Sequence, residues 1–118
     1  MRKKVLVVED DNDYLQTVME ILGDKGYNVI IKRDGSSVGS LVKKEKPDII
    51  LLDFKLPIRN GDEIALGLKK NKTTKEIPII MISADTEISV IAKRVGAEEY
   101  LEKPFKFSKL LQLIEKFA

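Results

Sequence analysis

The sequence predicts an α/β fold built from five repeats of a strand followed by a helix. Short apolar runs alternate with longer amphipathic stretches, and the third and fourth runs are uninterrupted Ile, Leu and Met, as in parallel strands buried on both faces. Such a chain, with right-handed crossovers, forms a doubly wound parallel sheet with helices on both faces. For five units, the strand order 2-1-3-4-5 of flavodoxin-like folds is expected.

Five apolar runs mark the strands, and the fifth run is the weakest. Glycine and proline stand at the joints between these runs and the amphipathic stretches, where the chain must turn. The predicted strands cover residues 5–8, 29–31, 49–52, 79–82 and 100–101.

Helices are predicted where apolar residues recur at i, i+3, i+4 and i+7, because this spacing places them on one helix face. Ser108 lies inside the last such pattern, so the sequence leaves the cap of that helix open. Two patterns are short: Val38, Leu41 and Val42, and then Ile64 and Leu68. Three are complete: Leu15, Val18, Met19 and Leu22; Ile88, Ile91, Ala92 and Val95; and Phe107, Leu110, Leu111 and Ile114.

The composition limits the chemistry that the chain can perform. Its 118 residues, 43% of them hydrophobic, suit one domain spanning residues 1–118. It has no Cys and no His, which excludes thiolate or histidine metal sites, a Ser-His-Asp arrangement and a phosphohistidine on this chain. Its 21 basic and 19 acidic residues are interleaved, so direct binding to nucleic acid is not expected. No apolar run approaches the ~20 residues of a membrane span, so we expect a cytoplasmic protein.

Chemistry-bearing side chains follow four of the predicted strands. Ligands of doubly wound sheets bind beyond the carboxyl ends of the strands. If the first, third and fourth strands are neighbours, the side chains at their ends converge on one cleft. The residues in question are Glu9, Asp10 and Asp11 after the first strand, Asp53 after the third, Ser83 after the fourth and Lys103 after the fifth.

Three carboxylates in one cleft repel each other, and a hard divalent cation such as Mg²⁺ would relieve that repulsion. An aspartate nucleophile beside Mg²⁺ and a lysine is a sound arrangement for accepting a phosphoryl group. Each residue alone has a simpler explanation: Asp53 as a turn former, or Asp11 as a helix cap, which is the role we expect for Asp11. Their joint placement on four strand ends favours the phosphoryl-acceptor site.

Four segments of the chain resemble the motifs of bacterial response regulator receiver domains. They are residues 5–11, 51–57 followed by Gly61, 82–84 and 96–105, and the resemblance covers essentially the whole chain. It implies that Asp53 accepts a phosphoryl group from a partner's phosphohistidine. It also implies that Asp10, Asp53 and the backbone carbonyl of Lys55 ligate Mg²⁺, while Glu9 acts through water in the metal's shell.

The resemblance further implies a conformational switch. Ser83 and Lys103 would contact the phosphoryl group, with Lys103 paired to Asp53 beforehand. Tyr100 matches the switch aromatic that turns inward when Ser83 moves, although an ordinary half-buried strand aromatic is the alternative. The readout surface would be the fourth helix, fifth strand and fifth helix. Lys55 and Asp85 flank the acceptor, and we expect them to pair over it and tune the lifetime of the phosphoryl group.

The implied partners are a histidine kinase or histidine phosphotransfer protein and a downstream target, which binds in trans or belongs to a longer parent chain. The chain would not be a turnover enzyme, since it promotes only transfer to its own Asp53 and later dephosphorylation. Three other classes remain as alternatives: a flavin carrier, which the acidic site disfavours; a Mg²⁺-dependent phosphohydrolase, which Lys55 two residues after Asp53 disfavours; and a receiver that signals without phosphate, which would have lost one of these groups.

Overall fold

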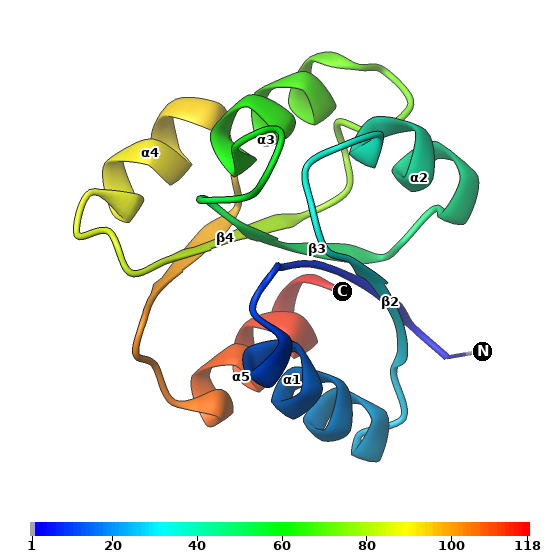
Figure 1. Cartoon of the computed structure of the whole chain (residues 1–118). Helices are drawn as coiled ribbons and strands as arrows, with labels where there is room; N and C mark the ends of the chain where they lie inside the picture. Colours follow the sequence, from blue (N-terminus) through cyan, green and yellow to red (C-terminus); the bar gives the residue numbers. More distant parts are fainter. Residues whose placement is uncertain (1) are drawn as a thin grey trace.

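Five parallel strands form one sheet in the order β2-β1-β3-β4-β5 (Figure 1). The structure is a computed structural model that describes residues 2–118. The fold class and the strand order predicted from the sequence are confirmed. The strands are β1 (Lys4–Val8), β2 (Asn28–Lys32), β3 (Ile49–Asp53), β4 (Ile79–Ser83) and β5 (Glu99–Glu102).

Five helices cover the two faces of the sheet. Figure 1 shows α1 (Asn12–Asp24) and α5 (Phe107–Phe117) on one face and α2 (Val38–Glu45), α3 (Gly61–Lys70) and α4 (Ile88–Val95) on the other. No helix in residues 2–118 is long and apolar enough to cross a membrane.

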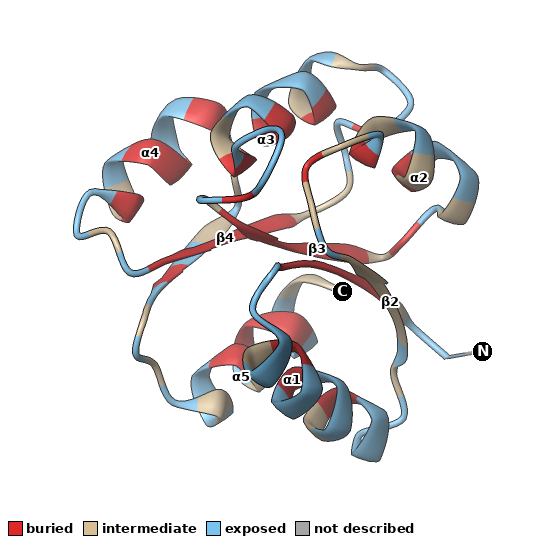
Figure 2. Cartoon of the chain, viewed as in Figure 1, coloured by how far each residue is buried: buried red, intermediate tan, exposed pale blue. Residues whose placement is uncertain are grey.

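The core consists of two apolar layers, one on each face of the sheet. Every residue of β3 and β4 is buried, which explains why their sequences lack polar alternation (Figure 2). Two details of the predicted helix faces are wrong. Met19 is 44% exposed on α1, because the buried stripe of that helix is narrower than the sequence pattern. On α5 Leu113 is buried while Leu111 is only partly buried, because the buried face is shifted around the helix relative to the pattern.

Two helix starts bear on the site. Asp11 caps α1 as expected, and its carboxylate accepts hydrogen bonds from the backbone nitrogens of Asp13 (3.0 Å) and Tyr14 (3.3 Å). Helix α5 begins after Lys106 without a side-chain cap, so Ser108, which lies inside this helix, is not its cap. The Asp11 carboxylate therefore caps α1, whereas Glu9 and Asp10 lie at the carboxyl end of β1.

Candidate active site

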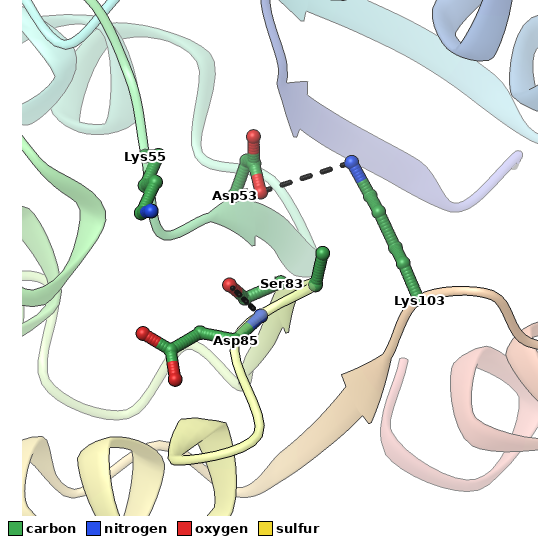
Figure 3. A pocket seen from close by; sticks show the side chains of 6 residues that line it. Asp53, Lys55, Ser83, Asp85 and Lys103 are labelled. Carbon is green, nitrogen blue, oxygen red and sulfur yellow. Dashed lines mark hydrogen bonds and ion pairs between the residues drawn. The ribbon is translucent and has the colours of Figure 1, made fainter.

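A cleft of about 260 Å³ opens at the carboxyl ends of the strands. Strands β1 and β4 flank β3 directly, so the residues that end these strands meet there. Figure 3 shows Lys55 and Asp85 on one side of the cleft and Lys103 reaching in from the other. The cleft is lined by Asp53, Lys55, Ser83, Ala84, Asp85 and Lys103.

Asp53 is held firmly at the end of β3. Its side chain is almost buried, and Oδ1 accepts a hydrogen bond from the nitrogen of Phe54 at 3.1 Å. The nitrogen of Gly61 donates to the carbonyl of Phe54 at 2.7 Å. A Cβ on Gly61 would lie 2.1 Å from the carbonyl oxygen of Asp53, so only glycine permits this approach. The start of α3 therefore fixes the backbone that carries Asp53.

Glu9, Asp10 and Asp53 form an acidic cluster in which one oxygen from each residue lies within 4.8 Å of the others. Glu9 and Asp53 are buried, and Asp10 is exposed. The pKa of Asp53 is raised to about 8, chiefly by burial, then by a hydrogen bond with Glu9 and by repulsion from Glu9 and Asp10, while the charge of Lys103 opposes the rise. Because the cluster holds more negative charge than one lysine neutralises, it fits a hard divalent cation with oxygen ligands.

Lys103 lies beside two carboxylates rather than one. Its Nζ donates to Oε1 of Glu9 at 3.0 Å and lies 3.8 Å from Oδ1 of Asp53. The sequence-based expectation paired Lys103 with Asp53 and assigned Glu9 to a water-mediated metal contact. Here Glu9 is the nearer partner: its carboxylate is buried, and Lys103 is the cation that pairs with it among the described ion pairs.

Ser83 ends β4 with its side chain buried at the cleft. Its Oγ accepts a hydrogen bond from the nitrogen of Asp85 at 3.0 Å, and Oδ1 of Asp85 accepts one from the nitrogen of Glu87 at 2.8 Å. The Asp85 carboxylate thus stabilises the turn into α4. No ion pair joins Lys55 to Asp85 among the described residues, so the expected pairing over Asp53 is not formed here, although both line the cleft (Figure 3).

Two tyrosines stand outside the cleft lining. Tyr100 lies on β5, 41% exposed, and does not point into the cleft in this conformation. Tyr14, on the first turn of α1, was missed by the sequence reasoning: its ring centroid lies 4.4 Å from Nζ of Lys103. No sequence pattern signals this contact, which joins α1 to the end of β5; Phe105 and Phe107, which follow Lys103, both pack against Tyr14.

The family model for the response regulator receiver domain matches residues 5–115. The chemotaxis response regulator CheY4 of Vibrio cholerae is 31% identical over 100% of both chains, with a TM-score of 0.90. A CheY-like receiver domain protein from Methanospirillum hungatei is 30% identical over 98% of this chain and 93% of its own, with a TM-score of 0.88.

A third structure resembles the chain in fold. The receiver domain of the sensor histidine kinase PA1611 from Pseudomonas aeruginosa is 24% identical over 99% of this chain and 98% of its own, with a TM-score of 0.89. It is described with a magnesium ion coordinated in its active-site cleft. The family match spans nearly the whole sheet and all the strand ends that meet at the cleft, and the chain therefore belongs to the receiver domains of two-component response regulators.

Proposed function

We propose that this receiver domain is a phosphorylation-dependent signalling switch whose acceptor is Asp53. The observation that carries the proposal is the convergence of Asp53, Ser83 and Lys103 on one cleft beside an acidic cluster. An oxygen of Asp53 would attack the phosphorus of a partner's phosphohistidine, the P–N bond would break, and the imidazole would leave. The product on this chain is an acyl phosphate on Asp53.

Lys103 and Ser83 are the groups that would contact the transferred phosphoryl group. Nζ of Lys103 already lies 3.8 Å from Asp53, where its charge can stabilise the equatorial oxygens. The hydroxyl of Ser83 lines the same cleft and can donate to one of those oxygens. Little else is required from the protein, because phosphoryl transfer depends mainly on positioning and charge neutralisation.

The cation that we propose for the acidic cluster is Mg²⁺. Asp10, Asp53 and the backbone carbonyl of Lys55 would hold it, and Glu9 would act through water. When bound, Mg²⁺ supplies positive charge that neutralises the donor's phosphoryl oxygens and keeps Asp53 ionised. The support is the cluster of three carboxylates, in which burial and the neighbouring Glu9 and Asp10 raise the pKa of Asp53, together with the magnesium described in the PA1611 receiver of the same fold.

The switch would start at Ser83. Its Oγ accepts the hydrogen bond from Asp85 at the start of the turn into α4, so a Ser83 hydroxyl drawn to the phosphoryl group pulls on that turn. Tyr100 pairs in register with Met81 on the neighbouring β4 and is exposed at present, which leaves an inward rotamer to be populated. The readout surface would be α4, β5 and α5.

Lys55 and Asp85 would tune the lifetime of the phosphoryl group, since both line the approach to Asp53. They need not be paired in the unphosphorylated protein, because phosphorylation adds about −1.5 to −2 charge beside them and so changes the electrostatic environment of both side chains. Dephosphorylation rates measured in Lys55→Ala and Asp85→Ala test this role, and unchanged rates in both variants would refute it.

The proposed partners are a histidine kinase or histidine phosphotransfer protein as donor and a downstream target protein. The receiver would not be a turnover enzyme, since it promotes only its own phosphorylation at Asp53 and its own dephosphorylation. Without any His, it requires the phosphohistidine of another protein or of another part of a longer chain.

Labelling with acetyl phosphate tests the proposal. Wild type should incorporate one labile phosphoryl group in the presence of Mg²⁺ and lose that ability when the metal is chelated. Asp53→Asn, which keeps the shape of the side chain without the nucleophilic carboxylate, should remain unlabelled. Equal and stable incorporation in wild type and Asp53→Asn would overturn the proposal.

A further inference from the structure

The ammonium group of Lys103 lies over the face of the Tyr14 ring. The distance from Nζ to the ring centroid is 4.4 Å, inside the ~6 Å range of a cation–π interaction. The lysine side chain is 24% exposed, so water screens this contact only in part. Lys103 thus has three neighbours: the carboxylate of Glu9, the carboxylate of Asp53 and the aromatic face of Tyr14.

The ring of Tyr14 is itself held in place by two other aromatics. Phe105 meets it edge-to-face at 5.9 Å and 79°, and Phe107 lies 6.0 Å away, tilted by 33°. The two phenylalanines also contact each other at 5.8 Å. Since Phe105 follows Lys103 by two residues, the segment that carries the lysine also carries part of the support for the ring beneath it.

The hydroxyl of Tyr14 contributes no contact that would explain its position. It is buried, and no hydrogen-bond partner within residues 2–118 is found for it. Burial raises the pKa of Tyr14, and the nearby Glu9 and Asp53 raise it further, so the phenol stays neutral. The ring face is therefore the part of Tyr14 that interacts with Lys103.

We infer that Tyr14 is a positioning residue that keeps Lys103 beside Asp53, whichever carboxylate the lysine is paired with. At rest the lysine donates to Glu9, while the chemistry proposed above requires it at the phosphoryl group on Asp53. A flexible ammonium released from Glu9 would otherwise sample open solvent. The ring offers a contact that persists through this exchange because it has no hydrogen-bond direction. The effect of Tyr14 on phosphoryl transfer rests on the proposed function, whereas the contact between Tyr14 and Lys103 does not.

The contact is testable in the resting protein by NMR of lysine side chains labelled with ¹³C and ¹⁵N. The Lys103 ε-methylene protons, assigned with Lys103→Arg, should be shifted upfield by the ring current. Tyr14→Phe should keep that shift and Tyr14→Leu should lose it. Phe107→Leu, which removes a ring from the same aromatic group but not the one under Lys103, should keep it. A shift that persists in Tyr14→Leu would overturn the inference.

The consequence is testable by the rate of labelling with acetyl phosphate in saturating Mg²⁺. Tyr14→Leu should slow labelling by about 3- to 10-fold, the range that a partly desolvated cation–π contact supports. Tyr14→Phe should restore the wild-type rate, and Phe107→Leu should stay within about 2-fold of it. A purely structural role predicts similar slowing in Tyr14→Leu and Phe107→Leu, and that result would refute the inference. If wild type itself is not labelled, the proposed function fails, and the NMR comparison alone decides whether Tyr14 positions Lys103.

Discussion

The two ends of the sheet differ in how completely their polar groups are paired. At the amino end, Glu98 accepts hydrogen bonds from the nitrogen of Ile79 and from Nζ of Lys69, both at 2.8 Å. Lys69 also donates to the carbonyls of Lys75 and Ile77, and the buried Thr74 hydroxyl donates to a carbonyl at the end of α3. Each of these polar groups has a partner within the chain.

At the carboxyl end, polar groups remain without full compensation. Three carboxylates cluster there and Lys103 pairs with two of them, Glu9 and Asp53, while burial and repulsion raise the pKa of Asp53 to about 8. The Tyr14 hydroxyl has no partner among the described residues. Ile58, a β-branched residue, has a φ of 74° in the loop after β3. The comparison indicates that the polar groups at the amino end stabilise the fold. At the carboxyl end, the clustered carboxylates and the strained backbone instead belong to a site that can bind a ligand.

The largest effect is expected from Gly61→Ala, because the new Cβ would lie 2.1 Å from the carbonyl oxygen of Asp53. The backbone would have to move, and the free energy of unfolding should fall by about 2–4 kcal/mol. Gly67→Ala is the matched control in the same helix. Its Cβ would meet only the end of the Arg59 side chain at 3.7 Å, so it should raise stability by about 0.5–1 kcal/mol. Urea unfolding followed by circular dichroism measures both, and equal effects would contradict the close approach.

Glu98→Ala should be the most damaging change to the amino end. It removes the acceptor for the Ile79 nitrogen and the ion pair with Lys69, and should lower the free energy of unfolding by about 1–2 kcal/mol, a range that allows for the partial exposure of Glu98. Glu98→Gln keeps an acceptor and should lose less than half as much. Denaturant titration of wild type, Glu98→Ala and Glu98→Gln measures these changes. An unchanged free energy of unfolding in Glu98→Ala would contradict the prediction.

Asp53→Asn should stabilise the metal-free protein, in contrast to changes at the amino end. It removes a buried charge that Glu9 and Asp10 repel, so the free energy of unfolding at pH 9 should rise by about 1–2 kcal/mol. Asp48→Asn is the control from the other end of the sheet, where the carboxylate accepts a hydrogen bond from the Lys4 nitrogen at 2.7 Å. That variant should be neutral or less stable. A loss of stability in Asp53→Asn would show that its charge is already compensated.

The benefit of Asp53→Asn should depend on pH. The raised pKa means that folded wild type holds a proton on Asp53 that the unfolded chain, with its ordinary pKa of 3.8, has released. The folded state binds more protons between these values, so this stability is present below about pH 4 and is lost as pH rises toward about 8. The difference between Asp53→Asn and wild type should therefore grow across that window and level off above it. A difference that is constant from pH 4.5 to 9, measured without metal, would contradict the raised pKa.

The smallest effect concerns the strained loop after β3. The carbonyl of Pro57 accepts a hydrogen bond from the Arg59 nitrogen at 2.8 Å across Ile58, whose side chain is 79% exposed. Ile58→Asn should raise stability by about 0.5–1 kcal/mol, because asparagine tolerates a positive φ and little apolar burial is lost. Ile58→Val keeps the branched Cβ and should gain nothing. Thermal unfolding that ranks the two variants equally would rule out backbone strain as the cause.

The fold was predictable because its signals are periodic and local. The apolar runs of β3 and β4 and the helical spacing on α4 leave few architectures open. All three elements are confirmed in the structure. Boundaries were less accurate: β5 is longer than residues 100–101 because strand pairing with β4 includes the polar Glu99 and Glu102. Hydrophobicity identifies a strand, but pairing decides where it ends.

The site was predictable as a set of residues but not as a network. Strand order brings Glu9 and Asp53 together, because β1 and β3 are neighbours in the sheet. Lys103 follows β5, which lies beyond β4, and its side chain reaches across to both carboxylates. Which carboxylate takes the lysine depends on distances of 3.0 and 3.8 Å, which no sequence pattern encodes. Tyr14 escaped notice for the same reason: its relation to Lys103 crosses from α1 to the end of β5.

Chemical mapping of the modified residue is the most direct test of the account. After labelling with acetyl phosphate and Mg²⁺, borohydride reduces an aspartyl phosphate to homoserine, which peptide mass spectrometry locates in the sequence. The account predicts homoserine at position 53 and at no other position, with Glu9 and Asp10 unchanged. Reduction at another aspartate with Asp53 intact would contradict it.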